Sequence, residues 1–203
     1  GREHEIHTCI ACNQAWLDHT FAMKTTSCLV NPRACHETQL KWGPATVTKN
    51  IAVVGAGPAG LAYATVAAER GHAVTLYDAA DEVGGQFNLA KQVPGKEEFH
   101  ETLRYYRAML EKYDVTVNLG QRVDADQLSE AGFDHVVVAT GISPRVPQIP
   151  GIEHEKVVGY IDAIKGNKPI GKTVAVIGAG GIGFDVTELI THEGTSSALD
   201  INL

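Results

Sequence analysis

A glycine-rich loop between an apolar run and a helix-compatible run is the feature that most constrains the fold of this chain. The loop carries Gly55, Gly57 and Gly60 in the sequence GAGPAG. Residues 50–54 (NIAVV) before it have the composition of a buried parallel strand, and residues 58–70 after it are rich in small residues. This strand–loop–helix order is typical of βαβ units that bind dinucleotides, so we expect an α/β fold with a Rossmann-type unit.

The three glycines of this loop each meet a steric need. Gly55 permits the tight turn, Gly57 lets the backbone approach a pyrophosphate, and Gly60 allows the helix to pack closely on the strand. Pro58 and Ala59 begin the helix, and its first N–H groups and positive dipole end would face the anion. We therefore expect the loop to bind the diphosphate of a dinucleotide.

Asp78 agrees with this expectation. It ends the apolar run 73–77 and comes 23 residues after Gly55, where a carboxylate accepts hydrogen bonds from a ribose diol. Apolar residues at a period near 3.6 predict a helix over 96–113. Further strands are predicted at 115–118, 134–139 and 173–177, with a last helix running to about residue 193.

Three short motifs resemble those of flavoproteins with two dinucleotide domains. They are GPAGL at 57–61, EVGGQ at 82–86 and an apolar strand ending in ATG at 136–141. The glycine pair would let the backbone run close to the flavin's diphosphate and ribityl chain, and the ATG turn would close the strand where the nucleotide passes. The residues predicted to bind FAD are Gly55, Gly57, Pro58, Ala59, Gly60, Asp78, Gly84, Gly85, Gln86, Val123, Ala139, Thr140 and Gly141.

A second loop, GAGGIG, repeats the first about 123 residues later and carries Gly178, Gly180 and Gly183. It again follows an apolar run and opens a helix, so we predict the start of an NAD(P)H-binding unit. Asp185 and Glu188 in that helix are interpreted as surface or helix-end charges. The strand that would carry the ribose-binding side chain is not reached, so the usual acidic-versus-arginine test between NADH and NADPH is not possible.

Charge and hydropathy exclude two classes of partner. The net charge is −7 and no basic run is longer than two residues, which argues against nucleic acid or an anionic membrane as partner. No apolar stretch approaches the length of a membrane span, and the first residues lack a signal-peptide segment. We expect a cytoplasmic location.

All four cysteines lie in the first 35 residues: Cys9, Cys12, Cys28 and Cys35. Clustered cysteines that begin with a C-x-x-C spacing favour metal or redox chemistry over a disulfide framework in such a chain. A four-cysteine zinc site is one interpretation, because such sites also begin with C-x-x-C.

From about residue 8 to about residue 193 the chain resembles bacterial NADPH-dependent 2,4-dienoyl-CoA reductases, in the wider group that includes trimethylamine dehydrogenase. The resemblance rests on CIACNQ at 9–14, TSCLVNPRACHE at 26–37, the FAD motifs, and KQVPGKEEFHETLRYYRAML at 91–110. It implies a long enzyme in which electrons pass from NADPH through FAD and a [4Fe–4S] cluster to FMN in a TIM barrel, where an unsaturated acyl-CoA is reduced. We expect an internal portion of such an enzyme, without the barrel or any catalytic residue, and inactive on dienoyl-CoA by itself.

The resemblance also implies a set of cluster ligands. Cys9, Cys12 and Cys28 match the first, second and fourth of the four cysteine positions, and Trp16 stands at the third, where an indole cannot replace a thiolate. Three explanations remain open: Trp16 is misassigned or mutated, Cys35 or a solvent oxygen completes the site, or the chain holds no cluster.

The expected organisation has three parts. Residues 1–48 form a cysteine-rich iron–sulfur segment and linker, 49–165 the N-terminal part of an FAD domain, and 166–203 the beginning of an NAD(P)H domain. Two alternatives to the reductase portion remain: a stand-alone FAD/NAD(P)H reductase subunit that passes electrons to a partner protein, and a non-catalytic FAD-binding piece with a structural metal.

Overall fold

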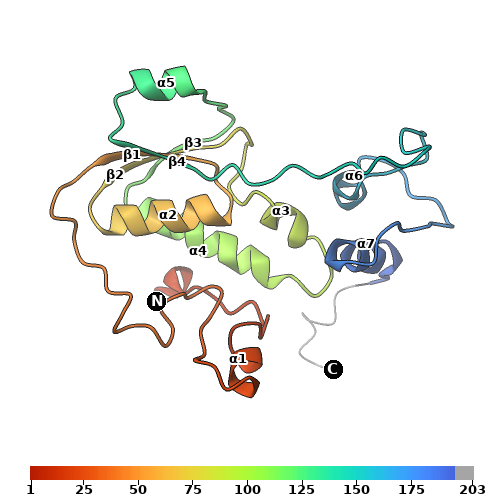
Figure 1. The fold of residues 1–203 in the computed structure, drawn as a ribbon, viewed down its shortest axis with the longest axis horizontal. Coiled ribbons are helices and arrows are strands. Elements are labelled where there is room, and N and C mark those ends of the chain that lie inside the picture. The colour runs from red at the N-terminus through yellow and green to blue at the C-terminus, as the bar shows by residue number, and fades with distance from the viewer. Residues whose placement is uncertain (195–203) are drawn as a thin grey trace. The chain divides into compact units, whose positions relative to one another are not determined.

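The computed structural model describes residues 1–194, and the chain divides into two compact units (Figure 1). The first unit consists of Gly1–Gly85 and Glu98–Gly141. The second consists of Gln86–Glu97 and the chain from Ile142 onward. This division differs from the predicted order of three consecutive parts, because the segment 86–97 leaves the first unit and packs with the second.

The first unit is built on a parallel four-stranded sheet in the order β3-β2-β1-β4. The strands are β1 (Asn50–Val54), β2 (Ala73–Tyr77), β3 (Thr116–Asn118) and β4 (His135–Val138). The central strand β1 pairs with β2 on one side and with β4 on the other. Its Ala52 and Val53 are completely buried, as expected for a continuous apolar run between two neighbouring strands. The predicted parallel α/β sheet with a Rossmann-type unit is confirmed.

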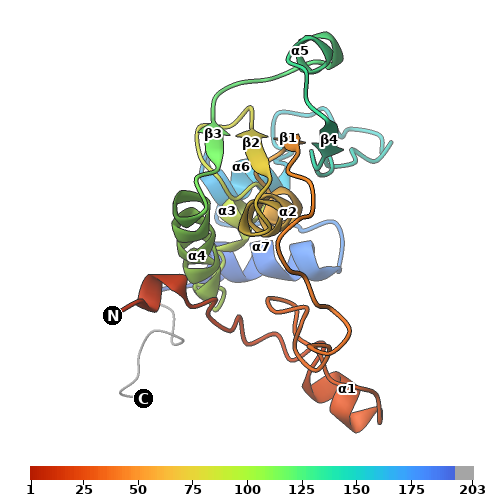
Figure 2. The same cartoon turned by 90° about the vertical axis from the view of Figure 1, so that its left-hand side faces the viewer.

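Two helices cover one face of this sheet, α2 (Pro58–Glu69) and α4 (Glu98–Lys112) (Figures 1 and 2). Helix α4 buries Leu103 and Leu110, which belong to the apolar stripe predicted from the sequence. The short helix α5 (Ala125–Glu130) begins with a capping box between Asp124 and Gln127. The helices predicted over 58–70 and 96–113 therefore form, with ends one or two residues shorter than predicted.

The cysteine-rich segment at the N-terminus is largely irregular, as predicted. It contains a single 3₁₀ turn, η1 (Glu3–Glu5), and one short helix, α1 (Leu17–Phe21). Four non-glycine residues of this segment adopt left-handed backbone angles, a conformation that L-residues rarely occupy. They are Ala11, Asn13, Met23 and Cys35.

In its described residues the second unit contains three helices: α3 (Phe87–Ala90), α6 (Tyr160–Lys165) and α7 (Gly181–Thr191). The strand predicted at 173–177 is wrong: these residues form no β-ladder. A strand needs a hydrogen-bonded neighbour, and the described part of this unit offers only helices and loops. The last nine residues of the chain, 195–203, lie outside the described residues.

Candidate functional site

The loop between β1 and α2 is shaped by its own glycines. Gly55 has a φ of +109°, and its N–H donates to the carbonyl of Tyr77 at 2.7 Å. A Cβ at Gly55 would lie 2.3 Å from the carbonyl oxygen of Ala139, and a Cβ at Gly60 would lie 1.8 Å from that of Gly55. Both positions therefore exclude any side chain, and the loop, strand and helix come together as predicted.

Ala56 is the residue at which the separate sequence motifs meet. Its N–H donates to Oδ2 of Asp78 at 2.5 Å, and its carbonyl accepts from the N–H of Gly84 at 2.8 Å. The other carboxylate oxygen of Asp78 accepts from the N–H of Ala80 at 2.8 Å. Asp78 and the glycine pair thus lie beside the loop, and each carboxylate oxygen keeps a lone pair for a further donor.

Gly57 differs from its neighbours because the protein does not require a glycine there. Its backbone is extended (φ −75°, ψ 179°), and a Cβ would meet nothing within 4 Å. Gly57 is the N-cap of α2, followed by Pro58 at the first helical position, so the free N–H groups of the helix face this open space. This open space beside the helix N-terminus, here called the open cradle, leaves room for the diphosphate of a dinucleotide.

Of the remaining residues of the predicted FAD site, some lie beside the first glycine loop and others have no contact with it that the structure gives. Gly85 approaches the loop, since a Cβ on it would lie 3.0 Å from Cα of Gly57. Thr140 lies close to Gly55, and Gly141 ends the first unit with a φ of +75°. For the other two, the structure gives their places in the chain: Gln86 is the N-cap of α3 in the second unit, and Val123 directly precedes the N-cap of α5. The binding roles of all these residues stay predictions.

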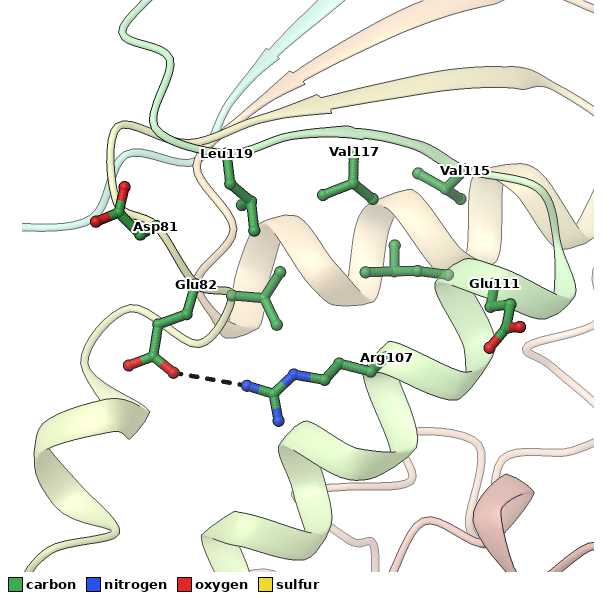
Figure 3. A pocket seen from close by; sticks show the side chains of 9 residues that line it. Asp81, Glu82, Arg107, Glu111, Val115, Val117 and Leu119 are labelled. Carbon is green, nitrogen blue, oxygen red and sulfur yellow. Dashed lines mark ion pairs between the residues drawn. The ribbon is translucent and has the colours of Figure 1, made fainter.

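A cavity of about 400 Å³ lies behind the EVGGQ motif, under the edge strand β3 (Figure 3). Its walls are aliphatic, and at its mouth Arg107 on α4 pairs with Glu82 at 3.6 Å. Both side chains are about half exposed, so the pair contributes little to stability. It does link the turn that precedes Gly84 to α4. The sequence pattern did not single out Arg107.

The second glycine loop repeats the local geometry of the first. A Cβ at Gly183 would lie 2.1 Å from the carbonyl oxygen of Gly178, whereas Gly180 caps α7 and a Cβ on it would meet nothing within 4 Å. Asp185, interpreted from sequence as a surface or helix-end charge, forms a half-buried ion pair with Lys96, Oδ2 to Nζ 2.6 Å. Lys96 lies 89 residues earlier in the chain, and no spacing rule could have paired the two.

The cysteines are all free thiols, and Cys9 and Cys35 are exposed. Within residues 1–194, no three His, Cys, Asp or Glu side chains are grouped so that they could hold a metal ion. Trp16, at the predicted third ligand position, is 60% exposed. The predicted ligands Cys9, Cys12 and Cys28 therefore do not converge, and these donors as they lie do not fit a cluster.

The first eight residues are attached to α4, a contact that the sequence did not predict. Glu5 pairs with Lys112 and also with Arg2. Hydrogen bonds from Arg2, and then from Lys112, lower the pKa of the Glu5 carboxyl to about 2. Burial lowers the pKa of His7 to about 4, so its ring is neutral near pH 7 and stacks on Tyr105.

We expect this attachment to weaken in acid. The pKa of Glu5 is about 2 in the folded protein against an ordinary 4.5, so its contribution is present above pH 4.5 and is lost as the pH falls toward 2. Amide NMR shifts of residues 2–8, followed from pH 6 down to about pH 2, measure this step. The Glu5→Gln variant should lack it while keeping any step that belongs to His7. An unchanged titration in Glu5→Gln would contradict the assignment.

No helix in residues 1–194 combines the length and the apolar character needed to cross a lipid bilayer.

Comparison with known proteins agrees with the geometry of the two loops. The family model of the pyridine nucleotide-disulphide oxidoreductases matches residues 49–197. A metal reductase of Desulforamulus reducens is 37% identical over 96% of this chain, and an NADH oxidase of Thermoanaerobacter brockii is 35% identical over 96%. The solved structure of 2-naphthoyl-CoA reductase with 2-naphthoyl-CoA shares 35% identity over 92% of this chain, with a TM-score of 0.88.

The chain spans about 30% of the length of these relatives: 30% of the metal reductase, 31% of the NADH oxidase and 29% of the naphthoyl-CoA reductase. These matches support membership of the wider family of reductases, but they do not single out the 2,4-dienoyl-CoA reductases that the sequence resembles. The relatives match nearly the whole chain, whereas the family model matches the dinucleotide-binding part, which begins at Lys49 and includes both glycine loops. The chain belongs to the pyridine nucleotide-disulphide oxidoreductase family.

Proposed function

We propose that this chain is the electron-transfer portion of a flavin-dependent reductase, with FAD held at the Gly55–Gly60 loop and NAD(P)H at the Gly178–Gly183 loop. The observation that carries the proposal is the open cradle at Gly57, bounded by Gly85 and by the N-terminus of α2. Gly43 and Gly159 are equally open, but at Gly57 the openness coincides with the N-terminus of α2 and with Asp78 bound to the preceding residue, Ala56, as a diphosphate site requires.

Each residue of the cradle has a task in this proposal. The N–H groups at the start of α2 donate to the diphosphate, and the positive end of the helix dipole stabilises its charge. Asp78 accepts from the ribose hydroxyls while its bond to Ala56 fixes its orientation. Gly84 and Gly85 keep the backbone close to the ribityl chain. When bound, FAD supplies the hydride and single-electron chemistry that the protein's own side chains lack.

The finer assignment is a reductase of unsaturated acyl-CoA thioesters, driven by NADPH, in the cytoplasm. The resemblance to dienoyl-CoA reductases supports it, as does the similarity to an enzyme named for an aromatic acyl-CoA. The acyl-CoA would react with FMN in a barrel domain that this chain does not include. The NADH oxidase among the relatives favours the other nucleotide, so we keep both NADH and NADPH as candidates.

FAD reconstitution tests the core of the proposal. The purified chain is incubated with FAD or with FMN, desalted, and its flavin-to-protein ratio is measured from the visible absorbance. We expect near-stoichiometric retention of FAD and none of FMN, because FMN lacks the second phosphate and the adenosine that the loop and Asp78 would bind. Equal retention of both flavins, or of neither, would refute an FAD site at this loop.

The iron–sulfur prediction has a separate test. If the resemblance assigns the ligands correctly, Trp16→Cys should raise the iron and sulfide bound after anaerobic reconstitution, because it completes a four-thiolate set. Leu17→Cys is the matched control, since it adds a thiol one position away from the predicted ligand. An equal rise in both variants, or no rise in Trp16→Cys, would show that Cys9, Cys12 and Cys28 are not ligands of a cluster.

A further inference from the structure

Residues 2–8, here called the N-terminal strap, lie along α4. Arg104 of this helix forms hydrogen bonds with three residues of the strap. Arg104 donates from Nη1 to the carbonyl of Glu3 at 3.1 Å. Its Nη2 donates to the carbonyl of Ile6 at 3.0 Å and to Oγ1 of Thr8 at 3.4 Å. Its Nε donates to Oε2 of Glu101 at 2.7 Å, which fixes the plane of the guanidinium. A single side chain thus connects three residues of the strap.

Two further contacts extend the attachment along α4. The ring of His7 stacks on Tyr105, with centroids 4.2 Å apart and planes 11° apart, and meets the edge of Tyr106 at 5.3 Å. Glu5 pairs with Lys112 near the end of the helix. The strap therefore contacts α4 from Glu101 to Lys112, a length of about three helical turns.

The other end of the cysteine-rich segment is held at the end of α2. Nε1 of Trp42 donates to Oε2 of Glu69 at 3.2 Å, and the guanidinium of Arg33 lies 4.6 Å from the centre of the Trp42 ring. Arg70 donates from Nε to the carbonyl of Gly43 at 3.3 Å. The stretch 9–32, with three of the four cysteines, is therefore fastened at both ends to the helices that pack on the FAD-type sheet.

We propose that Arg104 is a positioning residue, which fixes the cysteine-bearing stretch 9–32 against the FAD-type unit by holding the strap on α4. The role rests on the proposed function, because a stretch fixed against this unit keeps a constant distance from the flavin that the unit is proposed to bind. Arginine suits this role since its planar group offers five donors in a rigid fork. Lysine could satisfy only some of the three acceptors on the strap.

The test measures a distance inside the first unit. Cys12→Ser, Cys28→Ser and Cys35→Ser leave Cys9 as the one native thiol, and Tyr63→Cys adds a second on the exposed side of α2. Nitroxide labels at these two positions are followed by pulsed electron–electron double resonance. We expect a narrow distance distribution in this parent, a broader one shifted to longer distances in Arg104→Gln, and an intermediate one in Arg104→Lys.

Arg107→Gln is the matched control, since Arg107 lies one turn further along α4 and pairs with Glu82 instead of the strap. It should leave the distribution narrow. In the chain with all native cysteines, Arg104→Gln should keep the same FAD-to-protein ratio as the parent. An unchanged distribution in Arg104→Gln, an equal broadening in Arg107→Gln, or loss of FAD from Arg104→Gln alone would overturn the proposal. If the chain with all native cysteines binds no FAD, the proposed FAD site is refuted. The distance measurement still tests whether Arg104 holds the strap, because it does not require FAD.

Discussion

Replacing Gly57 by valine should remove FAD from the protein and leave the fold intact. A Cβ at Gly57 meets no protein atom within 4 Å, and its extended backbone is open to any residue, so the folded chain tolerates the substitution. The new methyl groups would occupy the space through which the diphosphate approaches. Forcing such a group into a packed interface costs about 1–3 kcal/mol, or roughly five- to over a hundredfold in FAD affinity.

The measurement is the FAD dissociation constant by fluorescence titration, together with the thermal unfolding midpoint. Gly43→Val is the matched control, because Gly43 is equally open but lies in the linker, and it should keep FAD. Gly60→Val gives the opposite contrast: its Cβ would lie 1.8 Å from the carbonyl oxygen of Gly55, so this variant should have a lower unfolding midpoint. Full FAD affinity in Gly57→Val would show that the cradle binds no diphosphate.

Replacing Gly180 by valine should remove NAD(P)H binding and leave FAD binding unchanged. Gly180 caps α7 as Gly57 caps α2, with the same extended backbone and the same open space beside its Cα. The same steric cost applies, so affinity for the reduced nucleotide should fall by about fivefold or more. Calorimetric titrations with NADH and with NADPH measure the loss.

Gly159→Val is the matched control for this variant. Gly159 also caps a helix of the second unit, α6, with an extended backbone and nothing within 4 Å of its Cβ position. It lacks the loop sequence GAGGIG, so nucleotide affinity should stay unchanged. Equal losses in the two variants would indicate a general effect on the unit, and no loss in Gly180→Val would remove the second loop from the binding site.

The FAD-type half of the fold was predictable because its signals are local and agree with one another. The apolar run at β1, the glycines that follow it and the stripe on α4 each depend on neighbouring residues, and the structure has them close to their predicted bounds. The convergence of Asp78, Gly84 and Ala139 on the first loop was also predictable, since parallel strands end at the same edge of a sheet.

Contacts between distant residues were not predictable in the same way. Nothing in the sequence pairs Arg104 with the strap or Lys96 with Asp185, because a charge on a helix surface has many equivalent partners until the chain is folded. The strand predicted at 173–177 failed for a related reason. An apolar run has strand propensity, but the strand forms only when a neighbouring strand accepts its backbone hydrogen bonds.

The sequence by itself determined the two dinucleotide-type loops, since the positive φ of Gly55 and the close contact of Gly60 with the Gly55 carbonyl arise within the loop itself. The approach of Ala139 to Gly55 comes from a distant part of the chain. Only the tertiary structure decided which glycine is open to a ligand, where the cysteines lie, and what holds their segment. Those properties depend on the atoms that other parts of the chain bring to each position. Gly57 and Gly60 are the same residue type three positions apart. The surrounding atoms leave Gly57 open to a ligand, whereas Gly60 lies in tight contact with the carbonyl of Gly55.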